Sequence, residues 1–429
     1  MNKKSKPPQI DISADPNPHP RTPLPTDFSS DKLKEINKLD LAIDFYLDRK
    51  SRYFRAVLGQ YVSLGIREKI QVSATVLVGA PSVQKSSMMN VLVGLQNTIV
   101  VDDFSPKAFV SGKAKLGEDG EEVQLINKIK NKLMITSDLG PLFTSPQSSE
   151  ILGKLVRIYD GYGMSKFDGL GEHGTNEIVR FNHIAAIPKM NSKVMSEMAH
   201  LGSRIFFLQI APPTLSVEEV VEKSLKILKQ DRNFKQKMEI LNNMVKAFLE
   251  NIEFKIDSIT WNSSADEADA HLLISRLATL LSITRGGVDQ NDGESLKEAT
   301  PRIVENFYTC TQGQAILEGR NFIKLEDVWL ASRICIDSCP IERKLVILEL
   351  LKHKQMNLKD LKLILSPKIK EIIDEKLKKR ISARIEKQIA EMQLIGLITI
   401  NSKRIVKFDP TIKKLMVELK DDILMAVRF

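Results

Sequence analysis

Residues 74–87 read Ala74-Thr-Val-Leu-Val-Gly79-Ala-Pro-Ser-Val-Gln84-Lys85-Ser86-Ser87. The β-branched run before Gly79 predicts a short strand, and the Gly-Ala-Pro sequence predicts a turn. A helix is expected to begin at Lys85. Backbone N–H groups at the start of such a helix, together with the helix dipole, bind phosphate. The order of strand, loop and helix therefore predicts a phosphate-binding loop.

Each polar position in this stretch has an expected role. The Lys85 amine would reach the terminal phosphates of a nucleotide, and the Ser86 hydroxyl would hold Mg²⁺. The other candidate nucleotide-binding residues are Gly79, Pro81, Gln84 and Ser87. The usual pattern, G-x-x-x-x-G-K-[ST], has glycine where this chain has Gln84. The alternative is an ordinary strand–turn–helix connection with an unrelated Lys-Ser pair.

The segment Gly79-Ala-Pro-Ser-Val-Gln-Lys85-Ser86 resembles the Walker A loop of the minichromosome-maintenance (MCM) helicases, a branch of the AAA+ ATPases. The loop of that family reads roughly G-D-P-G-x-A-K-S-Q and also lacks the second glycine. The resemblance implies a parallel α/β P-loop domain with flanking helices, an α-helical lid, and ATP and Mg²⁺ as cofactors. It covers roughly residues 60–345.

A candidate metal ligand follows the next apolar segment. Leu133-Met-Ile-Thr-Ser137-Asp138 predicts a central strand that ends in a carboxylate. The resemblance makes Asp138 the catalytic aspartate that binds Mg²⁺ or orients water. The family has an Asp-Glu pair there, whereas this chain has Asp138 after Ser137. An acidic residue after a strand is also common by chance. The missing carboxylate puts ATP hydrolysis in question more than nucleotide binding.

A glycine-rich segment, residues 160–174, follows the next predicted helix. It resembles the pre-sensor hairpin of MCM helicases, in which a lysine projects toward DNA in the central pore. The resemblance gives that role to Lys166, and the glycines would permit the tight backbone. The alternative is a mobile surface loop. The strand ending at Pro188 matches the family's sensor-1 strand, but Asn182 and Asn191 are displaced from its asparagine, so no sensor-1 residue is assigned.

Two arginines match further motifs of the family. Ser203-Arg204 precedes an apolar run and resembles the L-x-S-R-F-D-L-x-F segment, whose arginine reaches the ATP site of the neighbouring subunit. Arg302 resembles the sensor-2 arginine of the lid, which clamps the nucleotide. A planar guanidinium suits a γ-phosphate in either place. The alternative for Arg204 is a structural arginine at the start of a strand.

The C-terminal part predicts helices followed by a β-hairpin over residues 394–408, which is the layout of a winged helix. Between Lys359 and Lys407 there are 13 Lys and Arg against six Asp and Glu. This excess suits a polyanionic partner. The alternatives are a solvated helix face and a winged helix that contacts protein. The expected DNA contacts beside Lys166 are Lys379, Arg380 and Arg384 on the third helix, with Lys403 and Arg404 at the hairpin tip.

Composition bounds the rest of the chain. With 429 residues, of which 42% are hydrophobic, it can bury a large core. No apolar run approaches the ~20 residues that cross a bilayer, so we expect no membrane partner. Three cysteines without further ligands at zinc spacing predict a reduced intracellular protein, with Cys335 and Cys339 in its core. Seven prolines in residues 1–30 predict a disordered tail.

These patterns predict a Pro-rich tail at 1–30, an AAA+ P-loop core at 31–212, a helical lid at 213–340 and a winged-helix domain at 341–429. We expect a cytoplasmic, DNA-associated ATPase that forms a homo-oligomer, a hexameric ring by family analogy. It would move along DNA as a helicase or translocase in replication. A second hypothesis is a nucleotide-switched DNA-binding or assembly factor that scarcely hydrolyses ATP. A third is a regulator that acts through its winged helix.

Overall fold

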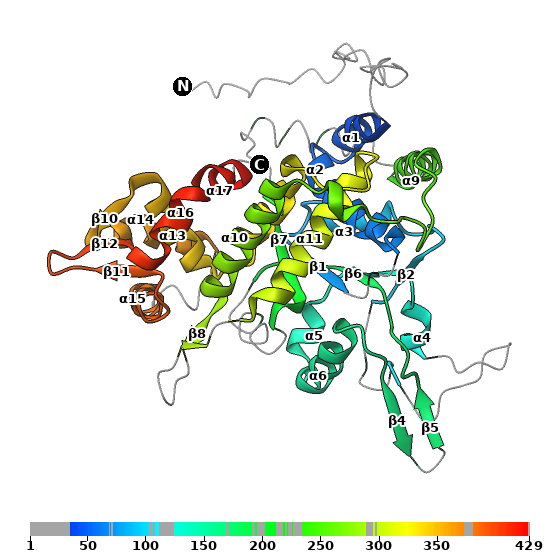
Figure 1. Ribbon diagram of the computed structural model, residues 1–429, viewed down its shortest axis with the longest axis horizontal. Helices are drawn as coiled ribbons and strands as arrows, with labels where there is room; N and C mark the ends of the chain where they lie inside the picture. Colours follow the sequence, from blue (N-terminus) through cyan, green and yellow to red (C-terminus); the bar gives the residue numbers. More distant parts are fainter. Residues whose placement is uncertain are drawn as a thin grey trace, which may run out of the picture.

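A parallel five-stranded sheet lies at the centre of the chain, in the order β2-β3-β6-β1-β7 (Figure 1). The computed structural model describes residues 35–67, 72–102, 124–168, 171–190, 202–211, 234–288, 298–372 and 381–427, with a few short stretches and single residues between them. The expected tail at 1–30 lies outside these residues. The sheet confirms the predicted α/β architecture, and its strands are β1 (Ser73–Val78), β2 (Thr98–Val100), β3 (Leu133–Thr136), β6 (Asn182–Ile187) and β7 (Ile205–Gln209).

Helices cover both faces of this sheet. Along β1, Leu77 packs into one apolar cluster, whereas Val76 and Val78 pack into another, because successive side chains of a strand point to opposite faces. The first cluster contains α1 (Glu35–Tyr46), α2 (Ser51–Val62) and α3 (Lys85–Asn90). The second contains α4 (Leu125–Ile129), α5 (Gly140–Thr144) and α6 (Ser148–Tyr159). The result is a three-layer domain.

The position of β2 differs from what its sequence predicts. The β-branched run Thr98-Ile-Val-Val predicts a buried strand, and this prediction is wrong, because β2 is one of the two edge strands and Val100 is 42% exposed. The β-branched composition indicates a strand but does not distinguish an edge from an interior position. By contrast, β1, β3 and β6 are buried along their whole length, as strands between two helical layers should be.

A helical segment follows the sheet. It contains α9 (Phe234–Asn251), α10 (Ala268–Arg285), the short ribbon of β8 (Gly287–Val288) and β9 (Ser295–Leu296), α11 (Thr300–Leu317) and α12 (Trp329–Asp337). The end of α12 is attached to the sheet, since Asp337 Oδ2 accepts the Gln209 N–H at 2.8 Å. Cys335 and Cys339 are completely buried and unpaired, which confirms that they are core residues.

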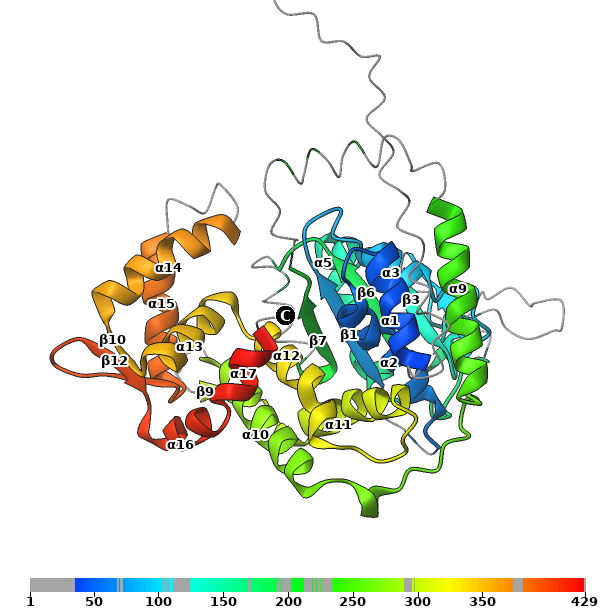
Figure 2. The same ribbon diagram turned by 90° about the horizontal axis from the view of Figure 1, so that it is seen from above.

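The C-terminal part combines helices with a small antiparallel sheet in the order β10-β12-β11 (Figure 2). The predicted hairpin over 394–408 is confirmed. The elements of the whole C-terminal part are α13 (Ile341–His353), β10 (Gln355–Asn357), α14 (Leu358–Ile372), α15 (Ile381–Leu394), β11 (Ile398–Ile400), β12 (Ile405–Phe408), α16 (Pro410–Glu418) and α17 (Lys420–Val427). The last helix returns to α12, where Arg333 Nη1 donates to the Ala426 carbonyl at 2.9 Å.

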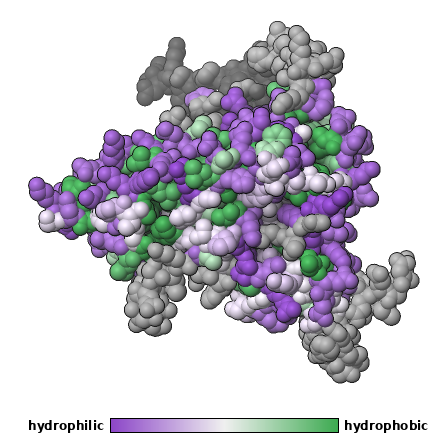
Figure 3. Space-filling model, viewed as in Figure 1, coloured by the Kyte–Doolittle hydropathy of each residue, from purple (hydrophilic) through white to green (hydrophobic). Residues whose placement is uncertain are grey.

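Hydrophilic side chains predominate on the face shown in Figure 3. Its apolar side chains form separate small patches, several of them over the C-terminal helices and strands. Among the described helices, none is both long and apolar enough to span a membrane.

Candidate functional site

The 79–84 loop connects β1 to α3 through a strained backbone. Ser82 and Gln84 both have positive φ, at 69° and 66°. At Gly79, a Cβ atom would lie 2.8 Å from Val83 Cγ2 and 3.1 Å from the Ile210 carbonyl oxygen, so a side chain does not fit. Gln84 adopts the left-handed conformation that favours glycine. The off-pattern residue therefore keeps the backbone shape that a glycine would take.

Lys85 folds over the start of this loop. Its Nζ donates to the carbonyls of Gly79 and Ala80, at 2.5 and 2.8 Å. Partial burial lowers the pKa of Lys85, and the nearby charge of Asp138 acts in the opposite direction. The structure thus brings together the lysine and the carboxylate that the sequence predicts as partners. Ser86, at the start of α3, is exposed.

Asp138 lies at the carboxyl end of β3, beyond the intervening strand β6. Its Oδ1 accepts the Gly140 N–H at 2.8 Å, and the residue is exposed. No cluster of three His, Cys, Asp or Glu side chains occurs among the described residues, so a protein-only metal cage is absent there. A hydroxyl and a single carboxylate, Ser86 and Asp138, do fit Mg²⁺, because this ion keeps waters and phosphate oxygens as its other ligands. The Gln84 Oε1 is a further buried oxygen without a partner in the described part of the chain.

Lys189 is a residue of this edge that the sequence analysis missed. The Ile187 carbonyl at the end of β6 accepts the Gly79 N–H at 3.2 Å. On the other side of β6, the Ala186 carbonyl accepts the Leu139 N–H at 2.8 Å. The chain that leaves β6 therefore emerges between the 79–84 loop and Asp138, and exposed Lys189 is its second residue. A search for asparagine alone at this strand end passes over the lysine. Asn191 lies outside the described residues.

The two predicted arginines bind the same carboxylate, at a distance from Lys85. Arg204 binds both oxygens of Asp160, through Nε at 2.7 Å and Nη2 at 2.9 Å. Arg302 Nη2 binds Oδ1 of the same carboxylate at 2.8 Å. Arg204 precedes β7, where Ile205 pairs with Ala74 near the amino end of β1. This triad of Arg204, Arg302 and Asp160 therefore lies at the end of the sheet opposite the 79–84 loop.

The glycine-rich segment forms a hairpin. Its strands β4 (Ser165–Asp168) and β5 (Gly171–Gly174) are antiparallel, and Lys166 is in register with His173. The ribbon projects away from the central sheet (Figure 1). Glycine is needed at its base, because a Cβ on Gly163 would lie 2.2 Å from the Thr175 carbonyl oxygen. The expectation of a tight hairpin is confirmed, while the role of Lys166 stays a prediction.

The five C-terminal residues that the sequence predicts as DNA contacts differ in their surroundings. Lys403 and Arg404 are exposed at the tip between β11 and β12, as the sequence predicts. Arg384 on α15 instead binds the buried Glu342 through its Nε, so its guanidinium has a structural partner. Lys379 and Arg380 lie outside the described residues.

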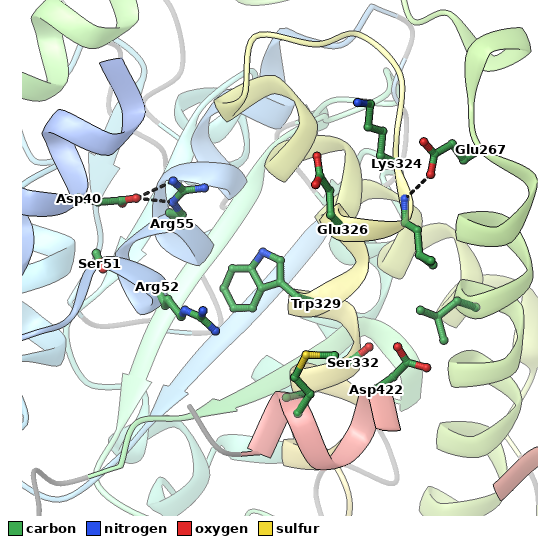
Figure 4. A pocket seen from close by; sticks show the side chains of 14 residues that line it. Asp40, Ser51, Arg52, Arg55, Glu267, Lys324, Glu326, Trp329, Ser332 and Asp422 are labelled. Atoms are coloured by element: carbon green, nitrogen blue, oxygen red, sulfur yellow. Dashed lines mark hydrogen bonds and ion pairs between the residues drawn. The ribbon is translucent and has the colours of Figure 1, made fainter. Parts of the chain in front are cut away.

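A hollow of about 920 Å³ lies between the N-terminal helices and the α12–α17 pair (Figure 4). The Arg52 guanidinium lies 5.9 Å from the ring centre of Trp329, and burial lowers the pKa of Arg52. Burial also raises the pKa of Asp40, although its ion pair with Arg55 opposes this effect. None of the ligands predicted from the sequence lines this hollow.

Comparison with protein-family models and with curated proteins finds no match to the chain.

Proposed function

We propose that this chain is an ATP-binding, DNA-associated AAA+ protein of the MCM-like type that works as an oligomeric translocase or helicase. One observation carries the proposal. Lys85 and Asp138 lie at one end of the sheet, whereas Arg204 and Arg302 lie at the other. Each subunit would therefore carry the phosphate-binding half of a nucleotide site at one end of its sheet and the arginine half at the other end.

The length of the strands supports this division. β1 and β7 pair over five residues, from Ala74 with Ile205 to Val78 with Gln209. Arg204 is level with Ser73, six residues before Gly79, so at ~3.3 Å per residue it lies about 20 Å from the 79–84 loop, which is farther than an extended arginine reaches. Arg204 would therefore act on a nucleotide held by a second subunit. A head-to-tail contact of this kind closes into a ring when its rotation permits.

The chain's own groups have separate tasks at the nucleotide end. Lys85 neutralises phosphate charge, and the backbone N–H groups of the loop and of α3 orient the phosphates. Ser86 and Asp138 would hold Mg²⁺, which shields the phosphate charge and polarises the terminal phosphoryl group. Lys189, between the loop and Asp138, adds a second cation near the terminal phosphate.

Two hairpins would contact DNA. The β4–β5 hairpin carries Lys166, and the β11–β12 hairpin carries Lys403 and Arg404. The order helix, strand, helix, helix, strand, strand from α13 to β12 is that of a winged helix, and we assign this domain to DNA binding. Phosphate contacts by these residues make DNA affinity fall steeply with salt. We propose a cytoplasmic, DNA-associated location for the protein.

The second candidate is a nucleotide-switched assembly factor that scarcely hydrolyses ATP. The sequence at the end of β3 favours it, because Ser137 precedes Asp138 and the Asp-Glu pair that would orient water is missing from these two positions.

ATP turnover with and without single-stranded DNA separates the two. DNA-stimulated turnover that Lys85→Ala abolishes supports the motor, and Lys166→Ala should then remove the stimulation while exposed Lys128→Ala does not. Tight ATP binding without turnover supports the switch. Absence of nucleotide binding contradicts both.

A further inference from the structure

Asp160 joins three parts of the chain that are far apart in the sequence. It follows α6, whereas Arg204 precedes β7 and Arg302 lies in the first turn of α11. Its two oxygens bind Arg204 at 2.7 and 2.9 Å, and Oδ1 also binds Arg302 at 2.8 Å. Two guanidinium groups share one carboxylate, so the triad carries a net positive charge.

The geometry of this triad fixes the direction of Arg204. A pair formed through Nε and Nη2 holds the plane of the guanidinium and turns the Nη1 edge away from Asp160. The Arg204 and Asp160 side chains are each 17% exposed, which makes their pair stronger and more rigid than a surface ion pair. Arg302 is more open to solvent at 31%. Both arginines are therefore pre-oriented before any ligand arrives.

The same residue adjoins the base of the β4–β5 hairpin. Gly161, the next residue, accepts the Val179 N–H at 2.9 Å. Arg157 Nε donates to the Gly163 carbonyl at 2.9 Å, which anchors the other side of the turn. A movement of the Asp160 carboxylate would consequently move the base of the hairpin. Nothing in the sequence around residue 160 indicates this link.

We infer that Asp160 is the positioning residue that aims Arg204 and Arg302 at the nucleotide of a second copy of this chain, and that it couples their position to the hairpin. This inference rests on the proposed function. A neighbour's terminal phosphate adds negative charge opposite the triad and draws the arginines toward it. The ion pairs between Asp160 and the two arginines then weaken, and the base of the β4–β5 hairpin shifts with Asp160.

The test is a substitution followed by subunit mixing, with the full-length protein. Asp160→Asn keeps the shape but replaces one acceptor oxygen with a donor group. We expect its affinity for a fluorescent ATP analogue to stay within about twofold of wild type, because its own 79–84 loop is intact. Its ATP turnover should fall by about 10- to 100-fold, part of the ~10³–10⁵ that an arginine finger supplies. Asp257→Asn, which removes the negative charge of one partner of Arg180 at the same end of the sheet, is the matched control and should turn over normally.

Mixing Asp160→Asn with Lys85→Ala decides between a positional and a structural role. The Lys85→Ala subunit supplies intact arginines to the intact loop of the Asp160→Asn subunit, so the mixture should recover about a quarter of wild-type turnover, which is more than the tenth or less that Asp160→Asn retains alone. Normal turnover of Asp160→Asn alone, loss of its nucleotide affinity, or no recovery on mixing overturns the inference. If wild type assembles on ATP without turnover, the same comparisons are made on assembly by sedimentation. Wild type that neither binds ATP nor assembles overturns the proposed function as well.

Discussion

Asp138 lies close enough to Lys85 for its charge to oppose the effect of burial on the pKa of the lysine. The two residues come from different strand ends, β1 and β3, with β6 between them. A cation for phosphate and a carboxylate for Mg²⁺ thus share one edge of the sheet.

Asp138→Asn should weaken Mg²⁺-dependent nucleotide binding. We expect the affinity for a fluorescent ATP analogue to fall about tenfold with Mg²⁺ present and to change little in EDTA, because only the metal ligand is lost. Exposed Asp269→Asn, in the first turn of α10, is the control and should leave both titrations unchanged. Equal losses with and without Mg²⁺ would contradict a metal-binding role.

Gln84→Gly should stabilise the protein. The left-handed conformation costs a residue with a side chain ~1–2 kcal/mol, which glycine avoids. Glycine also loses more conformational entropy on folding, and this loss offsets part of the stabilisation. The net gain in unfolding free energy should be about 0.5–1 kcal/mol, measured by thermal or urea unfolding. Gln84→Ala removes the same amide and its unpaired Oε1 but keeps the strain, so it should stabilise less than Gln84→Gly. An equal response of the two variants would show that backbone conformation is not the cause.

His183 should make stability depend on acid pH. Burial between Tyr159 and Thr136 lowers the pKa of His183 from 6.5 to about 3. Between about pH 3 and 6.5, His183 is therefore protonated in the unfolded chain and neutral in the folded chain. This group's contribution is present above about pH 6.5 and is lost as the pH falls toward 3, by about 1.4 kcal/mol per pH unit. Urea unfolding of His183→Gln between pH 7 and 5 should show a shallower decline than wild type, and identical slopes would refute the assignment.

Arg384→Ala should lower stability, whereas Lys403→Ala should change DNA binding. Loss of Arg384 leaves the buried Glu342 carboxylate without this partner, so the unfolding free energy should fall by about 1–3 kcal/mol. Lys403 is exposed at a hairpin tip, and its loss should leave stability within about 0.5 kcal/mol. In DNA titrations at several salt concentrations, Lys403→Ala should reduce the slope of log affinity against log salt by about one. An unchanged slope would exclude a phosphate contact at this position.

Local patterns predict the main strands of the central sheet, the 79–84 loop and the hairpin at 394–408, because turn residues and apolar runs act over a few neighbours, whereas the 160–174 hairpin is expected from the family resemblance. The edge position of β2 depends on strand order, which the composition of Thr98–Val100 does not encode. The convergence of Arg204 and Arg302 on Asp160 needs three distant segments to meet. Arg204 and Arg302 match local motifs, but the sequence around Asp160 does not indicate that it binds them. The position of Lys189 is not predicted for a different reason, since the family motif has asparagine near this strand end and gives no signal for a lysine.

The most direct test of shared sites mixes Lys85→Ala with Arg204→Ala. Each variant alone should be inactive, because one lacks the phosphate lysine and the other lacks the arginine at the opposite end of the sheet. In the mixture, the intact loop of one subunit can meet the intact arginine of the other. We predict recovery of a tenth to a quarter of wild-type ATP turnover, or of ATP-dependent assembly if turnover is absent. A mixture that stays as inactive as its parts, while wild type is active, would contradict a nucleotide site built from two subunits.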